Sequence, residues 1–500
     1  MCNCKPKCNK CVVEYTIRSL PYTISKPGQY CLCKDFVWAD ATQSAITVLN
    51  TENVVLNFNQ RKIETTVATT FPVVLVQGST DVVLHDVHLT ATGAGIYLVE
   101  GVDVISSNDV NIHSPVLLNL NFALYTEASN GVNVYHLYLK NDLPNVSTSI
   151  LFYDTVHVKF YDAEITNART TIRESEEVDI QRMSVKNSGA PGRRCLQIDS
   201  LVGKATAINL PPLRISNNIR VAYSIFSGAR NAGTVLLLGL PVVNTTTISA
   251  LSDGQTLPQA VINVASTAGF PTSGAINIET SLGFELVTYT GITATSFTGA
   301  LGGLGLMSTG GLVNQGLPGA LFDYPVRSVL IENSIMKTEA SQMGIGLQHS
   351  FGCTVRDNQV YGVLDSDGIF ISGSGNRVQN NTVRGEVLGA LSRGIILETA
   401  FSDTLGSLFS KHNTVDNNAV SGFDIGFIDT GIELASQALC TVLKSNVAVG
   451  NVQNYVINTG APQFTFYAVD NIDHCQAPPP LTLAQTNDSQ PQTDGDHVLD

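Results

Sequence analysis

Four copies of one short motif decide the fold: Gly344-Ile345-Gly346-Leu347, Gly368-Ile369-Phe370-Ile371, Gly394-Ile395-Ile396-Leu397 and Gly431-Ile432-Glu433-Leu434. Each copy reads Gly-Ile-x-aliphatic, and successive copies begin 24, 26 and 37 residues apart. A second motif, aliphatic-x-x-Asn-x-aliphatic, repeats at spacings of 25, 23 and 37 residues through Asn333, Asn358, Asn381 and Asn418. Because both motifs take the long step at the same place, the chain repeats with a period of about 25 residues.

Each repeat contains short strands and no helix. Apolar and polar residues alternate with period two in the runs 54–59, 82–87, 132–137 and 156–160, which is typical of half-buried strands. Such repeats predict the turns of a parallel β-solenoid, in which inward Ile and Val side chains stack on their equivalents in neighbouring turns. The recurrent asparagines should form a ladder of side-chain amides where the chain turns, and they tolerate left-handed φ there. The 37-residue step predicts about 12 extra residues, within 399–412.

The middle of the chain has a different composition. Residues 241–316 contain no Lys or Arg and only three acidic residues, Asp253, Glu279 and Glu285. Short apolar runs separated by Gly-rich turns predict a small all-β module inserted between two solenoid segments. Its low charge suggests that it packs on the solenoid or on another chain. The last residues, from 475, are polar and acidic after three prolines, and we expect them to be disordered.

The two repeat motifs resemble those of the right-handed parallel β-helix of pectin-lyase-like proteins, over roughly residues 30–473 outside the insertion. The opening segment 24–32 is also similar to the first turns of such proteins. Residues 262–271 and 287–291 are similar to small β-modules in surface and tail proteins of phages and large DNA viruses. The fold alone implies no single function, since it occurs in lyases, hydrolases, epimerases, adhesins and inert fibres.

We therefore predict an all-β protein: a right-handed parallel β-helix with a small inserted all-β module. About 14 turns, stacked at about 4.8 Å, would form a rod of about 65 Å. The predicted parts are a Cys-rich arm and cap (1–35), a first β-helix segment (36–238), the module (239–318), a second β-helix segment (319–474) and the tail (475–500).

Composition excludes several classes of function. The formal net charge of −14 disfavours binding to nucleic acid and to anionic membranes. No stretch approaches the ~18 apolar residues of a membrane span, and the N-terminus lacks the apolar stretch of a secretory signal. The sequence has no phosphate-binding loop, nucleophile elbow or HExxH motif. We expect no cofactor and no metal site.

The best catalytic candidates are Asp365 and Asp367, which lie two positions apart and so on one side of a strand. Arg393 follows Asp367 by about one repeat period, which places it in the adjacent turn. The resemblance implies a further Gly-His-Gly and an Arg-Ile-Lys, as in the β-helix hydrolases that cleave polygalacturonate, and this sequence has neither. A structural ion pair between Asp367 and Arg393 is the simpler interpretation.

Six of the ten cysteines are clustered near the N-terminus, up to Cys33. They could form disulfides or cross-links between copies of the chain, bind a metal, or remain free thiols. The candidates for disulfides or cross-links are Cys2, Cys4, Cys8, Cys11, Cys31 and Cys33.

Three other groups have both a functional and a structural interpretation. Arg193 and Arg194 could bind an acidic sugar or lie in a solvated turn. Four tyrosines could stack on sugars or form structural stacks: Tyr135, Tyr138, Tyr153 and Tyr161. His85 and His88, three apart on one presumed strand, would point to opposite faces and make poor joint metal ligands.

The leading hypothesis is a structural or adhesive component of the surface or fibre of a particle, such as a virion, cross-linked through its N-terminal cysteines. It rests on the absent catalytic constellation, the low-charge module and the clustered cysteines. The alternatives are a polysaccharide-processing enzyme (a hydrolase, lyase or epimerase) and a glycan-binding β-helix without turnover. The partners expected are further copies of the chain, for instance in a trimer, other particle proteins, or a glycan. The expected location is the surface of a virion or extracellular particle.

Overall fold

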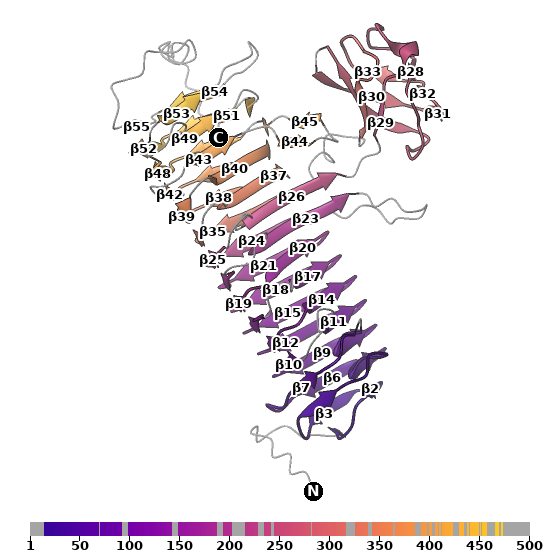
Figure 1. The fold of residues 1–500 in the computed structure, drawn as a ribbon, viewed down its shortest axis with the longest axis vertical. Coiled ribbons are helices and arrows are strands. Elements are labelled where there is room, and N and C mark those ends of the chain that lie inside the picture. Colours follow the sequence, from indigo (N-terminus) through magenta and orange to yellow (C-terminus); the bar gives the residue numbers. More distant parts are fainter. Residues whose placement is uncertain are drawn as a thin grey trace.

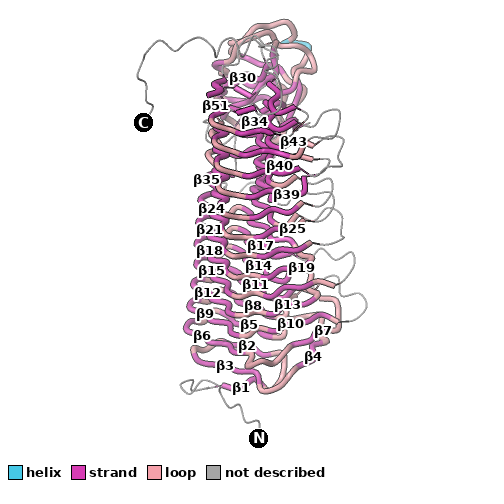
Figure 2. Tube along the Cα trace, turned by 90° about the vertical axis from the view of Figure 1, so that its left-hand side faces the viewer, coloured by secondary structure: helices cyan, strands magenta, loops and turns pink. Residues whose placement is uncertain are grey.

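The computed structural model describes residues 15–473 except for 70, 93–98, 143–148, 188–193, 203–215, 229–234, 242–244, 282, 317–325, 339–342, 364–365, 386–391, 398–399, 403–405, 409, 412, 424–429, 435–437, 440, 450, 452, 458–465 and 470–471. The described residues form a β-solenoid with three columns of parallel strands running along the rod (Figures 1 and 2). We call these columns face 1, face 2 and face 3, in the order in which the chain visits them within a turn.

Faces 1 and 2 belong to one 31-stranded sheet, which also contains the short strands β46 (Ser410–Lys411) and β50 (Ala438–Leu439). The strands of face 1 are β2 (Tyr22–Ile24), β5 (Ile46–Leu49), β8 (Val74–Gln77), β11 (Glu100–Ile105), β14 (Phe122–Glu127), β17 (Ser149–Tyr153), β20 (Arg169–Arg173), β23 (Leu196–Val202), β26 (Val235–Pro241), β37 (Ile345–Phe351), β40 (Asp367–Ser374), β43 (Arg393–Leu397), β49 (Thr430–Leu434) and β53 (Gln453–Ile457).

The strands of face 2 are β1 (Tyr15–Ile17), β3 (Gly28–Leu32), β6 (Glu52–Asn57), β9 (Thr80–His85), β12 (Asn108–His113), β15 (Asn130–Tyr135), β18 (Val156–Tyr161), β21 (Glu176–Gln181), β24 (Ser216–Ala222), β35 (Val326–Glu332), β38 (Thr354–Arg356), β41 (Arg377–Gln379), β47 (Thr414–Asp416), β51 (Thr441–Lys444) and β54 (Phe466–Val469).

Face 3 is a separate sheet to which the described residues contribute 14 strands, one for each turn. These are β4 (Phe36–Trp38), β7 (Ile63–Thr65), β10 (His88–Ala91), β13 (Val116–Leu118), β16 (Tyr138–Lys140), β19 (Glu164–Thr166), β22 (Ser184–Lys186), β25 (Ile225–Ser227), β36 (Ile335–Lys337), β39 (Gln359–Val363), β42 (Thr382–Gly385), β48 (Ala419–Ser421), β52 (Val447–Val449) and β55 (Ile472–Asp473).

The Gly-Ile-x-aliphatic motif forms continuous columns on face 1, as predicted. Ile345 pairs with Ile369, Ile369 with Ile395, and Ile395 with Ile432. The first three are fully buried. The glycine is needed because successive copies pack closely: a Cβ on Gly344 would lie 2.4 Å from Cγ1 of Val360 and 2.5 Å from the carbonyl oxygen of Gly368. The same steric limit recurs at Gly368, against Val383 and Gly394.

The asparagine ladder is also present, at the corner between faces 2 and 3. Nδ2 of Asn358 donates to Oδ1 of Asn381 at 3.1 Å, and Nδ2 of Asn381 donates to Oδ1 of Asn418 at 3.0 Å. Asn446 continues the ladder, accepting from Nδ2 of Asn418 at 3.0 Å. All four are buried, so the amides satisfy one another and nearby carbonyls away from water.

Two details of the asparagine prediction are wrong. Asn333 is not a member of the ladder, because Ile331 pairs with Val355 and the equivalent of Asn358 is therefore Ser334, whose backbone N–H donates to Asn358. Left-handed φ also belongs to the residue before each ladder asparagine, such as Asp357 and Asn380, both at φ 57°. Two adjacent positions therefore divide these roles. The residue with left-handed φ is exposed to solvent, and the buried asparagine that follows it makes the hydrogen bonds of the ladder.

The module lies between β26 and β35 without interrupting the stack. Val235 of β26 pairs directly with Ile345, and Ser216 of β24 pairs with Val326, so the turns before and after the insertion are in register. In Figure 1 the module stands beside the C-terminal half of the rod. Its buried hydrophobic cluster is distinct from that of the solenoid.

The module has two antiparallel sheets. The larger is formed by β27 (Thr245–Thr247), β34 (Leu312–Gly316), β29 (Gly274–Thr280), β30 (Gly283–Tyr289) and β33 (Leu301–Gly302), and the smaller by β28 (Val261–Asn263), β32 (Ser296–Thr298) and β31 (Gly291–Thr293). Within the described ranges the one helix is a single 3-10 turn in this module, η1 (Ala250–Ser252). The extra residues of the 37-residue repeat include an antiparallel hairpin of β44 (Ala400–Ser402) and β45 (Gly406–Leu408). This hairpin lies inside the segment 399–412 that the sequence predicts for the insertion.

Candidate functional site

The structure brings together two of the three predicted site residues. Asp367 begins β40, Arg393 begins β43, and the two are register partners on face 1. Nε of Arg393 donates to Oδ1 of Asp367 at 2.6 Å, and Nη2 donates to Oδ2 at 3.1 Å. Asp365 lies outside the described residues.

The Asp367 carboxylate is 7% exposed and uses both of its oxygens in this bidentate pair. Burial raises the pKa of Asp367, and the hydrogen bonds and charge of Arg393 oppose that rise. A carboxylate held by both oxygens in an arginine fork is a strong ion pair and is poorly placed to exchange a proton with a ligand. The geometry therefore favours the structural interpretation, and a catalytic role for Asp365, Asp367 and Arg393 stays a prediction.

A second group of carboxyls on face 1 was missed by the sequence analysis. Asp103 projects outward from β11, the strand that Glu100 begins, and its register partner on the adjacent strand β14 is Tyr125. Asp103 is 4% exposed, and among the described residues one of its oxygens, Oδ1, has no hydrogen-bond partner. Burial, followed by the negative charge of Glu100 and a hydrogen bond to it, raises the pKa of Asp103 to about 8. Burial raises the pKa of Glu100 as well, so the protonated form is favoured at both of these neighbouring carboxyls.

Further along the same face is a cluster of arginines. Arg173 donates to both oxygens of Asp199, at 2.8 Å each, and Asp199 is fully buried. Arg169 and Arg194 lie close enough to interact with Asp199 and with each other, and burial lowers the pKa of both guanidinium groups. Nε of Arg169 is buried, and no described residue forms a hydrogen bond with it. Three guanidinium groups around one buried carboxylate give this part of face 1 a local positive charge.

A signal for these groups existed in the sequence. Arg173 and Asp199 are separated by about one repeat period, the same separation as Asp367 and Arg393. Charged residues that interrupt an alternating apolar run, repeated one period later, mark outward positions that meet on neighbouring turns. Arg193, the other arginine considered from the sequence, lies outside the described residues.

The four candidate tyrosines do not form one sugar-binding platform, because they lie on three faces. Tyr135 and Tyr161 are on face 2, Tyr153 on face 1 and Tyr138 on face 3. The ring of Tyr135 stacks on that of His113 with centroids 5.0 Å apart, and His113 stacks on His85 at the same distance. Since neighbouring rings cover one another, this stack packs the outer surface of face 2 and favours the structural interpretation.

The expected shared strand of His85 and His88 is wrong. His85 ends β9 on face 2 and His88 begins β10 on face 3, with a corner between them. In the part of the chain that the structure describes, no three His, Cys, Asp or Glu side chains are grouped as metal ligands, and no helix is long and apolar enough to cross a membrane.

The cysteine prediction falls mostly on residues that the structure leaves undescribed, namely Cys2, Cys4, Cys8 and Cys11. Cys31 is buried in β3 and Cys33 is half-buried just after it, and no two described cysteines form a disulfide with each other. Cys353 is buried at the corner between faces 1 and 2, and burial raises the pKa of its thiol to about 12, which makes it unreactive.

The family comparison agrees with this architecture. Residues 315–470 match the family described as right handed beta helix region. The described residues form a right-handed parallel β-helix, the fold predicted from the repeat motifs. None of the curated proteins matches the sequence.

Solved structures with a similar fold include carbohydrate-modifying enzymes and phage proteins. The A-module of the mannuronan C-5 epimerase AlgE6 of Azotobacter vinelandii is 12% identical, with a TM-score of 0.47, over 90% of this chain and 91% of that one. The periplasmic alginate epimerase AlgG is 8% identical (TM-score 0.38; 87% and 78%). A double mutant of the tailspike protein of E. coli bacteriophage HK620, in complex with a pentasaccharide, is 9% identical (TM-score 0.38; 89% and 72%). At these identities and TM-scores the likeness assigns no activity to this β-helix.

Proposed function

We propose that this β-helix protein is a structural and adhesive component of the surface of a particle, such as a virion or its fibre. In this role the solenoid is a stiff spacer, the inserted module is displayed at its side, and the N-terminal cysteines link copies of the chain. A homotrimer fits such a fibre.

The observation that carries the proposal is the unbroken register across the insertion. Val235 precedes the module in the sequence and Ile345 follows it, yet they are neighbours in one buried column. The solenoid therefore accommodates a whole module inserted at one of its corners, and the module has its own hydrophobic core. A rod that carries an independently packed domain at its side is suited to display rather than to enclosing a reaction.

The state of the predicted catalytic pair supports a non-enzymatic role. Asp367 and Arg393 neutralise each other in a closed bidentate contact.

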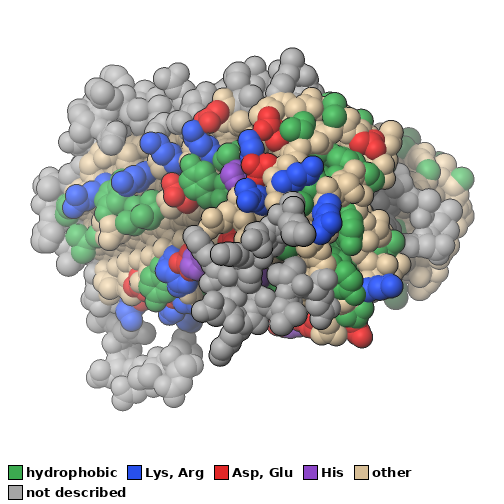
Figure 3. Space-filling model, turned by 90° about the horizontal axis from the view of Figure 1, so that it is seen from below, with side chains coloured by type: hydrophobic (Ala, Val, Ile, Leu, Met, Phe, Trp, Pro, Cys, Tyr) green, Lys and Arg blue, Asp and Glu red, His purple; other side chains and the backbone are tan. Residues whose placement is uncertain are grey.

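Seen from below, acidic, basic and apolar side chains are interspersed on the surface (Figure 3). The resemblance of the module sequence to modules of phage and large DNA virus proteins favours a virion.

The test is electrophoresis of the native protein from purified particles, with and without reductant. We expect covalent multimers that reduction converts to a single 53.3 kDa chain. Replacing Cys2, Cys4, Cys8 and Cys11 by Ser should remove the multimers. Cys353→Ser is the matched control and should leave them unchanged, because Cys353 is buried within the solenoid and is not among the N-terminal cysteines. A monomeric band under both conditions, together with absence from particles, would contradict the proposal.

A second function is favoured by one observation, the buried Asp103 carboxyl close to Glu100 on face 1, where burial raises the pKa of both groups. A protonated acid next to a carboxylate is an arrangement used in acid-base catalysis on sugars. A panel of acidic and neutral polysaccharides should be screened for new reducing ends, unsaturated sugars or epimerised units. Product that disappears in Asp103→Asn but persists in Asp367→Asn would support processing at this pair, and no product on the panel would argue against it.

A further inference from the structure

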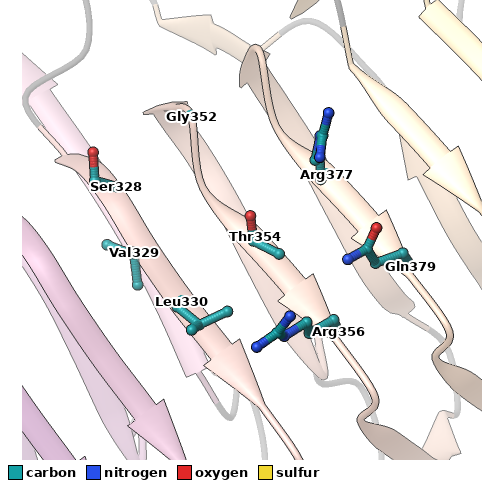
Figure 4. A pocket seen from close by; sticks show the side chains of 8 residues that line it. All are labelled: Ser328, Val329, Leu330, Gly352, Thr354, Arg356, Arg377 and Gln379. Atoms are coloured by element: carbon teal, nitrogen blue, oxygen red, sulfur yellow. The ribbon is translucent and has the colours of Figure 1, made fainter. Parts of the chain in front are cut away.

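Face 2 contains a hollow that the functions above do not use. It lies across β35, β38 and β41, has a volume of about 350 Å³, and is lined by Ser328, Val329, Leu330, Gly352, Thr354, Arg356, Arg377 and Gln379 (Figure 4). This volume lies within the range of small-molecule sites.

The hollow exists because the strands are short and two outer positions carry little bulk. β38 and β41 have three residues each, whereas β35 has seven. At Gly352, which has φ 63°, an added Cβ would meet no atom of the described residues within 4 Å. Thr354 lies between Leu330 on one side and Arg377 on the other. A small side chain between two larger neighbours leaves a depression, and Leu330 forms an apolar wall of it.

The lining is cationic and rich in hydrogen-bond donors. It contains two arginines and no acidic residue. Nε and Nη2 of Arg356 donate to Oε2 of Glu332, at 2.9 and 2.6 Å. Glu332, which is 4% exposed, also binds Arg220 at 2.7 Å, so that a single carboxylate serves two guanidinium groups. Two further acids lie near these arginines: Asp357, 3.9 Å from Arg356, and Asp179, 3.6 Å from Arg220.

Arg377 has no such acidic partner within the described part of the chain. Its side chain is exposed, and among the described residues no acidic group forms an ion pair with it. Arg377 shares the hollow with Arg356 of the adjacent strand β38. The register partner of Arg356 on β41 is Gln379. The hydroxyls of Ser328 and Thr354 and the amide of Gln379 line the remainder (Figure 4).

We propose that this hollow binds an acidic sugar, with Arg377 and Arg356 contacting the carboxylate or sulfate group of one saccharide unit. Guanidinium groups bind such oxyanions through paired N–H donors. The Ser, Thr and Gln side chains offer donors and acceptors to sugar hydroxyls, and Leu330 offers an apolar surface to the ring. The proposal rests on the adhesive part of the proposed function and supplies its ligand class, at a site on face 2 that is separate from the charged groups of face 1.

The test is titration calorimetry of the full chain at low salt with three hexasaccharides. These are a galacturonate hexamer, its carboxyl-reduced neutral counterpart, and a heparin-derived sulfated hexamer. We expect saturable binding of an acidic hexamer and none of the neutral one. Binding of the galacturonate or of the heparin hexamer identifies the anion as carboxylate or sulfate.

Arg377→Gln should weaken binding at least tenfold, because a hydrogen-bonded charge is lost, and 0.5 M salt should weaken wild-type binding further. Arg384→Gln is the matched control: Arg384 is also exposed but lies on β42 of face 3, so its substitution should leave binding unchanged. Circular dichroism would confirm that both variants are folded. Equal binding by Arg377→Gln and wild type, equal binding of neutral and acidic hexamers, or no saturable binding would each overturn the proposal. Because Arg377 is far in sequence from the N-terminal cysteines, particle association would persist in Arg377→Gln, and a failed sugar site is distinguishable from a failed particle role.

Discussion

Replacing Asn381 tests how the solenoid is held together at the corner between faces 2 and 3. The Asn381 side chain is 1% exposed. Its Oδ1 accepts from the backbone N–H and from Nδ2 of Asn358, at 3.1 Å each. Its Nδ2 donates to Oδ1 of Asn418 and to the carbonyl oxygens of Val355 and Gln379, at 2.9 to 3.0 Å.

Asn381→Ala leaves the backbone N–H of Asn358 buried without an acceptor, whereas Nδ2 of Asn358 keeps a bond to the carbonyl of Ile331 at 2.9 Å. One orphaned donor plus the lost bonds should cost about 2 to 4 kcal/mol. Asn381→Asp should cost more at pH 7, because a buried anionic oxygen would face three acceptors. That extra cost should shrink toward pH 4, where the carboxyl takes up a proton and becomes a donor.

The control is the neighbouring asparagine. Asn380 is exposed, has φ 57°, and bonds Asp357 at 3.1 Å and Asn417 at 2.8 Å. Asn380→Gly keeps the left-handed backbone and loses only solvent-exposed bonds, so it should cost less than about 1 kcal/mol.

The assay is amide hydrogen exchange at the corners containing Asn358 and Asn418, combined with urea unfolding followed by circular dichroism. Local exchange is the primary readout because a solenoid is stabilised turn by turn and need not unfold in one step. Equal loss of protection in Asn381→Ala and Asn380→Gly would refute the reasoning. So would Asn381→Asp being as stable as Asn381→Ala at pH 7.

Three further predictions concern charge and modularity. Burial and the charge of Glu100 raise the pKa of Asp103 to about 8. The folded chain therefore holds a proton at Asp103 that the unfolded chain releases near pH 4. As a result, the free energy of unfolding should fall as pH rises from about 4 to 8. Melting temperatures across this range should show a flatter profile for Asp103→Asn, and parallel profiles would contradict the expectation. In a double-mutant cycle, Asp367→Asn and Arg393→Gln should show a coupling of about 1 to 3 kcal/mol in urea unfolding, and additive effects would show that the pair is not stabilising. Residues 242–318 expressed alone should give dispersed amide NMR signals, because the module has its own core, and a collapsed spectrum would show that it depends on the solenoid.

The columns of face 1 could be predicted because one inward position repeats as Ile in four successive turns. The asparagine ladder was predictable for the same reason, but its first member was placed one residue early, because Ser334 replaces asparagine there and Asn333 stands beside it. A sequence motif cannot distinguish the residue that makes the buried hydrogen bonds from its neighbour that adopts left-handed φ.

The candidate site was only partly predictable. A separation of one period correctly paired Asp367 with Arg393, since register alone decides which outward residues meet. The hollow around Arg377 depends on strand length and on the open space at Gly352, which alternation does not encode. The raised pKa of Asp103 likewise results from burial of an outward residue on face 1, and outward positions are expected from sequence to be solvated.

The central claim is that the turns before and after the module stack in register, and methyl NMR of isotope-labelled protein tests it most directly. The paired strands place Val235 beside Ile345, and Ile345 beside Ile369, about 4.8 Å apart at the backbone. Strong methyl-to-methyl NOEs are therefore expected between Val235 and Ile345 and between Ile345 and Ile369. Absence of the first NOE, or contacts of Val235 with the module core at Ile262 instead, would contradict the account.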